Sequence, residues 1–229
     1  AAIVKKEKDE ATKISEDSMR IAAVLSLPMG VGLAVLSRAV VGVFYPQTNA
    51  MGPTLLSWLG VASIFVCITL VTNAILQADG DEVLPIISMV IGGVVKIACN
   101  LLLVRRPELN IQGAAIGTIA CYAVISLLNC IFIHRRLAVK PNYARAFLRP
   151  LLASLVMGAA AWGVYGIVYR VLRLAPDSGR LLNLLALLIA VGIAVAVYLV
   201  MIVLTRSVTL EDMKLIPKGE KLARLLHIR

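Results

Sequence analysis

The sequence predicts an all-α fold, a polytopic bundle of transmembrane helices. Hydrophobic residues make up 60% of the chain and the mean hydropathy is +0.90, far above the values of a soluble domain. The apolar residues fall into six runs, most of them close to the roughly 20 residues that a helix needs to cross a bilayer. Polar and charged residues separate these runs. The six predicted spans are residues 21–37, 54–78, 84–104, 111–133, 150–169 and 181–205.

The net charge of +10 comes mainly from the segments between the apolar runs. In a soluble protein this charge would suggest nucleic-acid binding, but the sequence has no RNA-binding signature and no interleaving of basic with aromatic residues. In a membrane protein, the same charge indicates orientation and attraction to anionic lipid. We therefore expect membrane lipids, and no nucleic acid, among the partners.

The first 37 residues predict a polar entry followed by a kinked span. Residues 1–20 alternate lysines with acidic residues at helical spacing, which predicts a cytoplasmic polar helix or linker. The first span contains Pro28, and membrane helices tolerate proline when neighbours satisfy the carbonyl that it frees. Residues 38–45, beginning with Arg38, predict a short amphipathic turn at the interface.

The second span carries a polar row in which Thr69, Asn73 and Gln77 are four residues apart. Residues at this spacing share one face of a helix. A polar face on a membrane helix is expected to look into a bundle or a wet cavity instead of lipid. The stretch Asp79-Gly80-Asp81-Glu82 then predicts a tight acidic turn into the third span.

The third span has a lysine near its centre. Lys96 belongs to a second row of period four, together with Ser88, Gly92 and Asn100. A charged side chain at the bilayer centre costs roughly 3 kcal/mol on insertion scales, so an intramembrane lysine is a functional-site hypothesis by default. The alternative is a structural lysine that hydrogen-bonds to facing carbonyls or reaches an interface.

The last three spans are less informative. The fourth opens with small residues from Gly113 to Gly117, a pattern for close helix packing. It then carries a polar row made of Thr118, Tyr122 and Ser126. Residues 134–149 predict a basic loop, and residues 206–229 predict a basic amphipathic tail on the cytoplasmic membrane surface.

The positive-inside rule predicts that both termini are cytoplasmic. With that orientation the inner segments contain 16 lysines and arginines and the outer segments contain 6. The remaining cation is Lys96, inside the membrane. The acidic turn at residues 79–82 carries no Lys or Arg and is the one inner segment that does not follow the rule.

The sequence carries no pattern for covalent chemistry. The four cysteines, which all lie in apolar runs, form no CxxC pair and are interpreted as small packing residues. No nucleophile–base pair and no metal-ligand spacing is present, so we expect no catalytic residues, no metal and no cofactor. The chain begins with Ala1 and has no signal peptide, from which we expect a fragment that lacks an N-terminal part.

Several soft motifs, in a specific order, resemble a known transporter family. They are Leu76-Gln77 with Gly80, Pro85-Ile86, Gly92, Lys96, Asn100, Pro107, Leu109-Asn110-Ile111 and the stretch from Gly113 to Gly117. This pattern is similar to the stage V sporulation protein B branch of the multidrug/oligosaccharidyl-lipid/polysaccharide (MOP) flippase superfamily. The resemblance extends over nearly the whole chain, including the entry span and the tail.

The resemblance implies a fold of fourteen helices in two lobes, of which this chain would form the C-terminal part, helices nine to fourteen. The implied activity is flipping of a lipid-linked oligosaccharide, such as a peptidoglycan precursor or a polysaccharide unit, across the bacterial cytoplasmic membrane by alternating access. The cargo would be a polyprenyl-diphosphate-linked sugar, and the missing N-terminal half of the same protein would be a partner. Lys96, Asn100, Asn73 and Gln77 are the groups that we expect near the cargo.

Three alternatives remain at this stage. A cation-coupled multidrug antiporter of the same superfamily would need intramembrane carboxylates, and the six spans contain none. A membrane polyprenyl-phosphate sugar transferase would need acid or histidine clusters in an outer loop, where only Glu108 and Asp177 are available. The third alternative is a purely structural membrane subunit.

Overall fold

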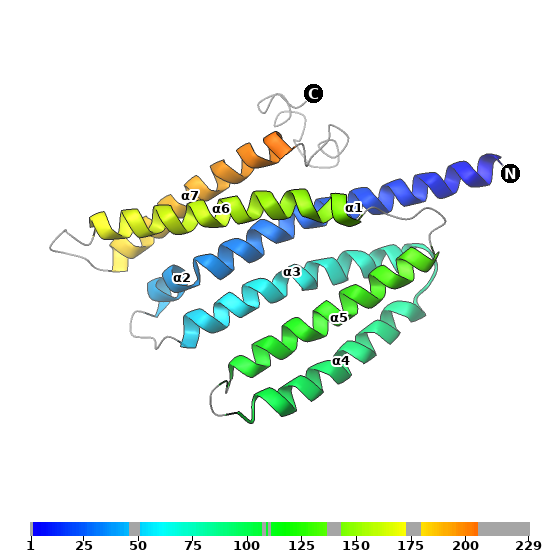
Figure 1. The fold of residues 1–229 in the computed structure, drawn as a ribbon, viewed down its shortest axis with the longest axis horizontal. Coiled ribbons are helices and arrows are strands. Elements are labelled where there is room, and N and C mark those ends of the chain that lie inside the picture. Colours follow the sequence, from blue (N-terminus) through cyan, green and yellow to red (C-terminus); the bar gives the residue numbers. More distant parts are fainter. Residues whose placement is uncertain are drawn as a thin grey trace.

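The structure, a computed structural model, describes residues 2–45, 51–106, 109, 111–136, 143–172 and 180–205. Within these ranges it contains seven α-helices and no strand (Figure 1). Six of the helices are long and apolar enough to cross a membrane, and α2 is a short helix of 8 residues. The helices are α1 (Ala2–Val35), α2 (Ser37–Phe44), α3 (Met51–Ala78), α4 (Val83–Leu103), α5 (Gln112–Arg136), α6 (Tyr143–Leu172) and α7 (Arg180–Thr205).

The prediction of an all-α polytopic bundle with six spans is confirmed. The candidate spans are Lys13–Val35, Met51–Ala78, Val83–Leu103, Gln112–Arg136, Phe147–Val171 and Leu181–Thr205. The segment 134–149, expected to be a loop, is helical at both ends, because α5 continues to Arg136 and α6 begins at Tyr143. The basic last turn of α5 explains part of this extension, since cations stabilise a helix C-terminus. The predicted tail at 206–229 lies outside the described residues.

Helix α1 runs without a break through Pro28. In a regular helix the N–H of residue 28 would bond to the carbonyl of Val24, and proline has no N–H to donate. The hydroxyl of Tyr198 on α7 donates a hydrogen bond of 2.6 Å to that carbonyl. A neighbouring helix therefore supplies the donor that Pro28 removes, as the sequence predicted for a membrane helix.

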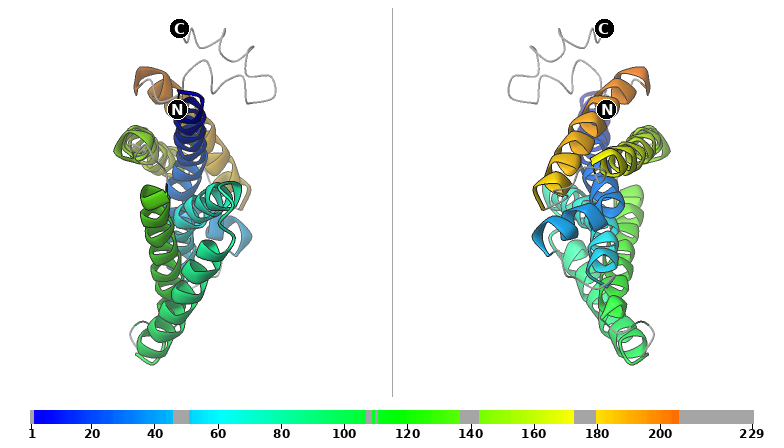
Figure 2. Two further views of the ribbon diagram at one scale, coloured as in Figure 1. Left: turned by 90° about the vertical axis from the view of Figure 1, so that its right-hand side faces the viewer. Right: turned by 90° about the vertical axis from the view of Figure 1, so that its left-hand side faces the viewer.

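The helices form a row in which chain order and spatial order differ. The row runs α4, α5, α3, α1, α6, α7, with extensive contact between each neighbouring pair (Figure 1). Helix α5 lies between α3 and α4, and α1 lies between α3 and α6. The short α2 packs against α3 and α7 at one end of the row. Figure 2 shows the same helices from their ends.

Two glycines bring α1 and α3 into backbone contact. A Cβ atom added to Gly30 would lie 2.7 Å from the carbonyl oxygen of Gly60, and one added to Gly60 would lie 2.8 Å from the carbonyl oxygen of Gly30. Both distances are shorter than real Cβ contacts, so a larger residue at either position must push the helices apart. Small residues commonly allow this close approach in membranes.

Much of the apolar surface has no packing partner in the chain. The most hydrophobic window of each span is only 11–33% buried, and α4 has the lowest value. The main buried cluster joins α1, α2, α6 and α7 around Leu36, Met157 and Tyr198. A smaller cluster joins α1, α3 and α5 around Met19, Leu76 and Ile133. The exposed apolar remainder is suited to lipid or to further helices.

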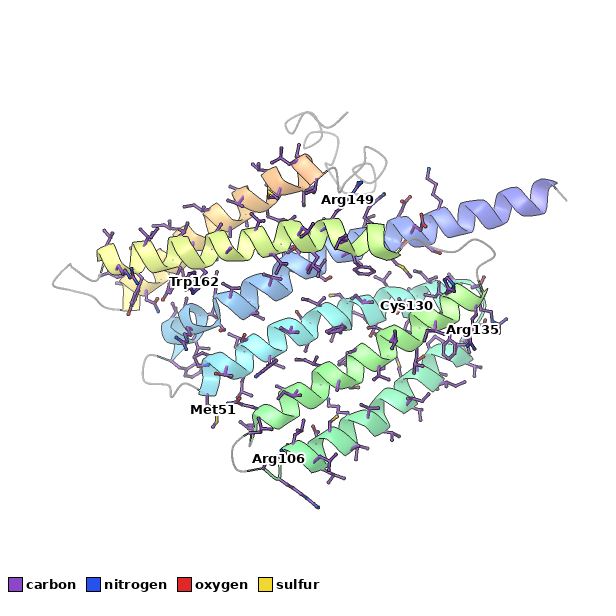
Figure 3. The ribbon with its side chains drawn as sticks, in the orientation of Figure 1. Met51, Arg106, Cys130, Arg135, Arg149 and Trp162 are labelled. Carbon is purple, nitrogen blue, oxygen red and sulfur yellow. The ribbon has the colours of Figure 1, made fainter. Side chains whose placement is uncertain are left out.

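Charged side chains mark the two ends of the bundle. Arg135 and Arg149 lie at one end, whereas Arg106 and Met51 lie at the other (Figure 3). At the first end, Arg136 pairs with Asp81 in the turn between α3 and α4, at 3.1 Å between Nε and Oδ2. This pair is partly exposed, so its contribution to stability is about 1 kcal/mol or less.

Candidate functional site

Helix α4 lies at one end of the row and packs almost entirely against α5. The face that it turns to α5 is the predicted row of period four. Ser88 is buried and donates to the carbonyl of Leu84 within its own helix, at 3.2 Å. Gly92 lies directly against Ile125 of α5, leaving no room for a Cβ atom. The row is therefore the α4–α5 contact, and the opposite face of α4 carries exposed Ile, Val and Leu side chains.

Lys96 lies on this face, about ten ångströms from the C-terminal end of α4 at 1.5 Å per residue. Its side chain is only partly buried, and it makes no hydrogen bond or ion pair with the described residues. It lies in the neighbourhood of Cys121 of α5. The described part of the chain thus holds an unpaired cation within a membrane span, at the edge of the helix row.

Asn100 lies one turn further along the same face. A Cβ atom at Gly117 of α5 would collide with its Oδ1 atom, so this glycine makes room for the asparagine. The Oδ1 atom is buried and has no hydrogen-bond partner in the part of the chain that the structure describes. A buried acceptor without a donor costs about 1–3 kcal/mol, so this oxygen is suited to accept a hydrogen bond from a further group.

Asn73 belongs to a different seam, between α3 and α5. Asn129 of α5 donates from Nδ2 to Asn73 Oδ1 at 2.6 Å and to Thr72 Oγ1 at 3.0 Å. One turn away, the hydroxyls of Thr69 and Ser126 are 2.9 Å apart. All five side chains are buried, so the polar row of α3 faces α5 within the bundle.

The four predicted cargo residues are thus distributed over three places. Lys96 and Asn100 share the α4–α5 contact, Asn73 lies in the α3–α5 seam, and Gln77 is exposed near the end of α3. The two seams use different faces of α5, because Gly117 and Cys121 meet α4 whereas Ser126 and Asn129 meet α3. The four residues therefore do not form one cluster among the described residues.

Sequence reasoning missed Asn129, which donates two hydrogen bonds to α3 in the α3–α5 seam. It is fully buried, and its Oδ1 atom has no partner among the described residues. A signal was present, because Asn129 lies three residues after Ser126 and so extends the polar row of α5 by one turn. Thr72 was missed for a different reason, since it lies beside the period-four row and not in it.

The described residues form no cluster for metal binding, since no three His, Cys, Asp or Glu side chains among them lie together. None of the cysteines Cys67, Cys99, Cys121 and Cys130 forms a disulfide with another described residue. The polar groups of the site are one ammonium, several amides and hydroxyls. Such groups bind an anionic or sugar-bearing molecule through charge and hydrogen bonds.

Comparison with known proteins identifies the family. The family model of the lipid II flippase MurJ matches residues 1–176. The chain is 26% identical over 227 residues to the uncharacterized membrane protein YabM of Bacillus subtilis, which covers 97% of the chain and 41% of that protein. It is 28% identical over 189 residues to the lipid II flippase MurJ of Bacillus subtilis, covering 80% of the chain and 34% of that protein. No solved structure matches the chain significantly.

The chain spans less than half the length of these two relatives. Together with the six apolar helices, the matches identify a multi-pass bacterial membrane protein. The resemblance to the MOP flippase superfamily is confirmed, and the branch that the family model matches is that of MurJ. The chain therefore belongs to the MurJ family of lipid II flippases.

Proposed function

We propose that this chain forms part of a transporter that flips a lipid-linked oligosaccharide across the cytoplasmic membrane by alternating access. The cargo would be a peptidoglycan precursor or a polysaccharide unit on polyprenyl diphosphate. Family membership supports the proposal, as does the name of the relative, a lipid II flippase. Because the chain spans only 34–41% of these relatives, we propose that a further segment, equivalent to the N-terminal half, completes the transporter.

The observation that carries the proposal is the unpaired Lys96. The described spans contain no carboxylate that neutralises it, and α4 has packing partners on one side only. A cation kept inside a membrane at a cost of roughly 3 kcal/mol needs a compensating group. A diphosphate passing along the α4–α5 edge would supply that group, and the lysine would lower the barrier that a charged head group meets in a low-dielectric medium.

Asn100, Asn73 and Gln77 are proposed as hydrogen-bonding groups for the same cargo. The buried, unpartnered Oδ1 atom of Asn100 supports a role for this residue, because the hydroxyls of a sugar are suitable donors. Asn73 would first have to leave its bond with Asn129, which makes it a group for a rearranged state. Gln77 is exposed near the α3–α4 turn, where a cargo would enter or leave the membrane.

The test uses the complete polypeptide from the gene that encodes this chain, reconstituted in liposomes with a fluorescent polyprenyl-diphosphate sugar. We expect the protein to flip this lipid, and Lys96→Met to lower the rate at least tenfold, because methionine keeps the length of the side chain and removes its charge. Lys96→Arg should retain much of the activity. Arg106→Met is the matched control, since it removes an exposed cation beyond the end of α4.

Unfolding midpoints in detergent distinguish a transport defect from a folding defect. Flipping by Lys96→Met at the rate of the unmutated protein would make Lys96 a structural residue. Failure of the unmutated protein to move any of several lipid-linked sugars would overturn the flippase proposal itself. Drug efflux driven by a cation gradient would then be the activity to measure.

A further inference from the structure

A cleft of about 400 Å³ lies where the α1–α2 junction meets the last turns of α6, away from the α4–α5 edge. One wall consists of the end of α1 and the start of α2, with Val35, Leu36, Arg38 and Ala39. The other wall is a face of α6 from Trp162 to Arg170, with Gly163, Tyr165, Gly166 and Ile167 between them. These α6 residues cover about 12 Å along the helix axis.

Two arginines lie in this cleft, one from each wall. Arg38 and Arg170 are both exposed, and neither forms a hydrogen bond or an ion pair with the residues that the structure describes. No acidic side chain lines the cleft. Two unpaired guanidinium groups on facing walls favour an anion, and arginine matches the geometry of a phosphate group well.

The part of the cleft deeper in the membrane is apolar and open. Trp162 is 71% exposed and Ile167 is 65% exposed, although both are large hydrophobic residues. A Cβ atom added to Gly163 or Gly166 would meet nothing within 4 Å, so the space beside these two glycines on α6, which we call the channel, is open. The lining residues of the cleft continue along α6 from Arg170 toward the centre of the span, where Trp162 lies (Figure 3 shows Trp162 on α6).

A hydrogen-bonded frame holds the two walls in place. Asn183 of α7 accepts a bond of 2.7 Å from the hydroxyl of Tyr165, and its Nδ2 atom lies 3.4 Å from the carbonyl oxygen of Ala39, to which it donates. Tyr165 also stacks on Tyr169, with ring centroids 5.6 Å apart. The shape of the cleft is therefore fixed by contacts among α2, α6 and α7 before any ligand arrives.

We propose that this cleft binds one anionic phospholipid, with its phosphate between Arg38 and Arg170 and an acyl chain along Gly163 and Gly166. The charge favours a phosphate, and the apolar channel that continues from the arginines favours a phosphate that carries a hydrocarbon chain. Aromatic residues near the ends of spans are typical of the lipid head-group region. This lipid site is separate from the proposed cargo path and does not depend on flippase activity.

The experiment is native mass spectrometry of the complete polypeptide from the gene that encodes this chain, in a neutral detergent, titrated with phosphatidylglycerol or with phosphatidylcholine. We expect one tightly held phosphatidylglycerol and weaker binding of phosphatidylcholine. The double variant Arg38→Gln/Arg170→Gln should weaken phosphatidylglycerol binding about 30-fold, because each arginine near an anionic lipid adds roughly a fivefold preference. The matched control is Arg105→Gln/Arg106→Gln, which removes two exposed cations near the end of α4.

A second pair of variants tests the acyl-chain channel. Gly166→Leu fills the channel without touching the fold and should weaken binding while both arginines remain. Gly192→Leu on α7 also enters open space, but it lies outside the cleft and should leave binding unchanged. Unfolding midpoints in the same detergent check that each variant is folded.

Three outcomes would overturn the proposal. Equal losses in the two arginine double variants would make the effect one of net charge. Unchanged binding in Gly166→Leu would mean that no acyl chain occupies the channel. Displacement of the lipid by millimolar inorganic phosphate would mean that the arginines hold a soluble anion instead of a lipid.

Discussion

The contact between Tyr198 and Val24 shows how one side chain compensates for a proline in a helix of this kind. Pro28 leaves the Val24 carbonyl without its helical donor, and the Tyr198 hydroxyl supplies one from another helix. The hydrocarbon core of a bilayer contains no water that could donate a hydrogen bond to an unsatisfied backbone carbonyl. Tyr198 is 8% exposed, so water has little access to replace the bond.

We expect Tyr198→Phe to lower the free energy of unfolding by about 1 kcal/mol, because it removes this donor and leaves the ring. In a Pro28→Ala background the helix regains its own N–H, and the same change should cost less than about 0.5 kcal/mol. Denaturation in mixed detergent micelles measures all four proteins of this cycle. An equal loss of unfolding free energy on Tyr198→Phe in both backgrounds would mean that the hydroxyl does not compensate for Pro28.

Single residues of the candidate site were only partly predictable. The period of four identified Asn73 and Asn100, because residues on one helix face are visible in the sequence. The hydrogen-bond partner of Asn73 could not be predicted, because Asn129 is 56 residues away and only the packing of α5 on α3 brings the two together. The sequence likewise predicted Lys96 as a site residue but did not indicate that its row faces α5.

At the scale of elements, helix packing depends on where small residues lie. The crossing of α1 and α3 at Gly30 and Gly60 is a contact between backbones, with each glycine against the carbonyl of the other. Gly92 and Gly117 serve the α4–α5 contact in the same way, but they accommodate side chains, Ile125 and Asn100. Backbone against backbone leaves less scope for adjustment than backbone against a flexible side chain.

Gly60→Ala should therefore destabilise the protein by about 1–3 kcal/mol, since the new methyl group overlaps α1 backbone atoms that have no rotamer to change. Gly192→Ala is the matched control and should be neutral or stabilising by up to about 1 kcal/mol, because it meets open space in a helix. Detergent denaturation compares the two variants. A similar stability for both would mean that α1 and α3 separate without cost.

Element boundaries were predictable where composition changes sharply. The predicted span 84–104 is shifted by one residue relative to α4. The predicted span 181–205 begins one residue after the start of α7 and ends with it. The boundaries of α5 and α6 were less accurate, because basic residues there continue a helix beyond the apolar run. Hydropathy marks where a helix enters lipid, whereas hydrogen bonds determine where the helix ends.

At the scale of the whole molecule, the row α4–α5–α3–α1–α6–α7 was not predictable from the sequence. Short turns suggest that consecutive helices are neighbours, yet α3 and α4 are linked by a four-residue connection and barely touch. Their separation follows from α5, whose two polar or small faces bind α3 and α4 separately. Which helices become neighbours depends on the fit of complete helix surfaces and not on any local sequence pattern.

The orientation of the molecule remains a prediction of the charge count, and the structure provides two positions to test it. Arg106 and Arg135 lie at opposite ends of the bundle (Figure 3). In a background in which the four cysteines are replaced by alanine, we expect a membrane-impermeant maleimide to label Arg106→Cys on intact cells. Arg135→Cys should be labelled only after permeabilisation. The reverse pattern would place both termini outside and contradict the positive-inside interpretation.

The bond between Tyr198 and Val24 also has a consequence for the order of events during synthesis. The two residues are 174 positions apart, so a ribosome adding about 5–20 residues per second makes the tyrosine roughly 9–35 s after the carbonyl that needs it. For that interval α1 is in the membrane with its proline uncompensated and α7 not yet made. The nascent α1 therefore lacks this support at Pro28, and it gains the support only when α7 has been made.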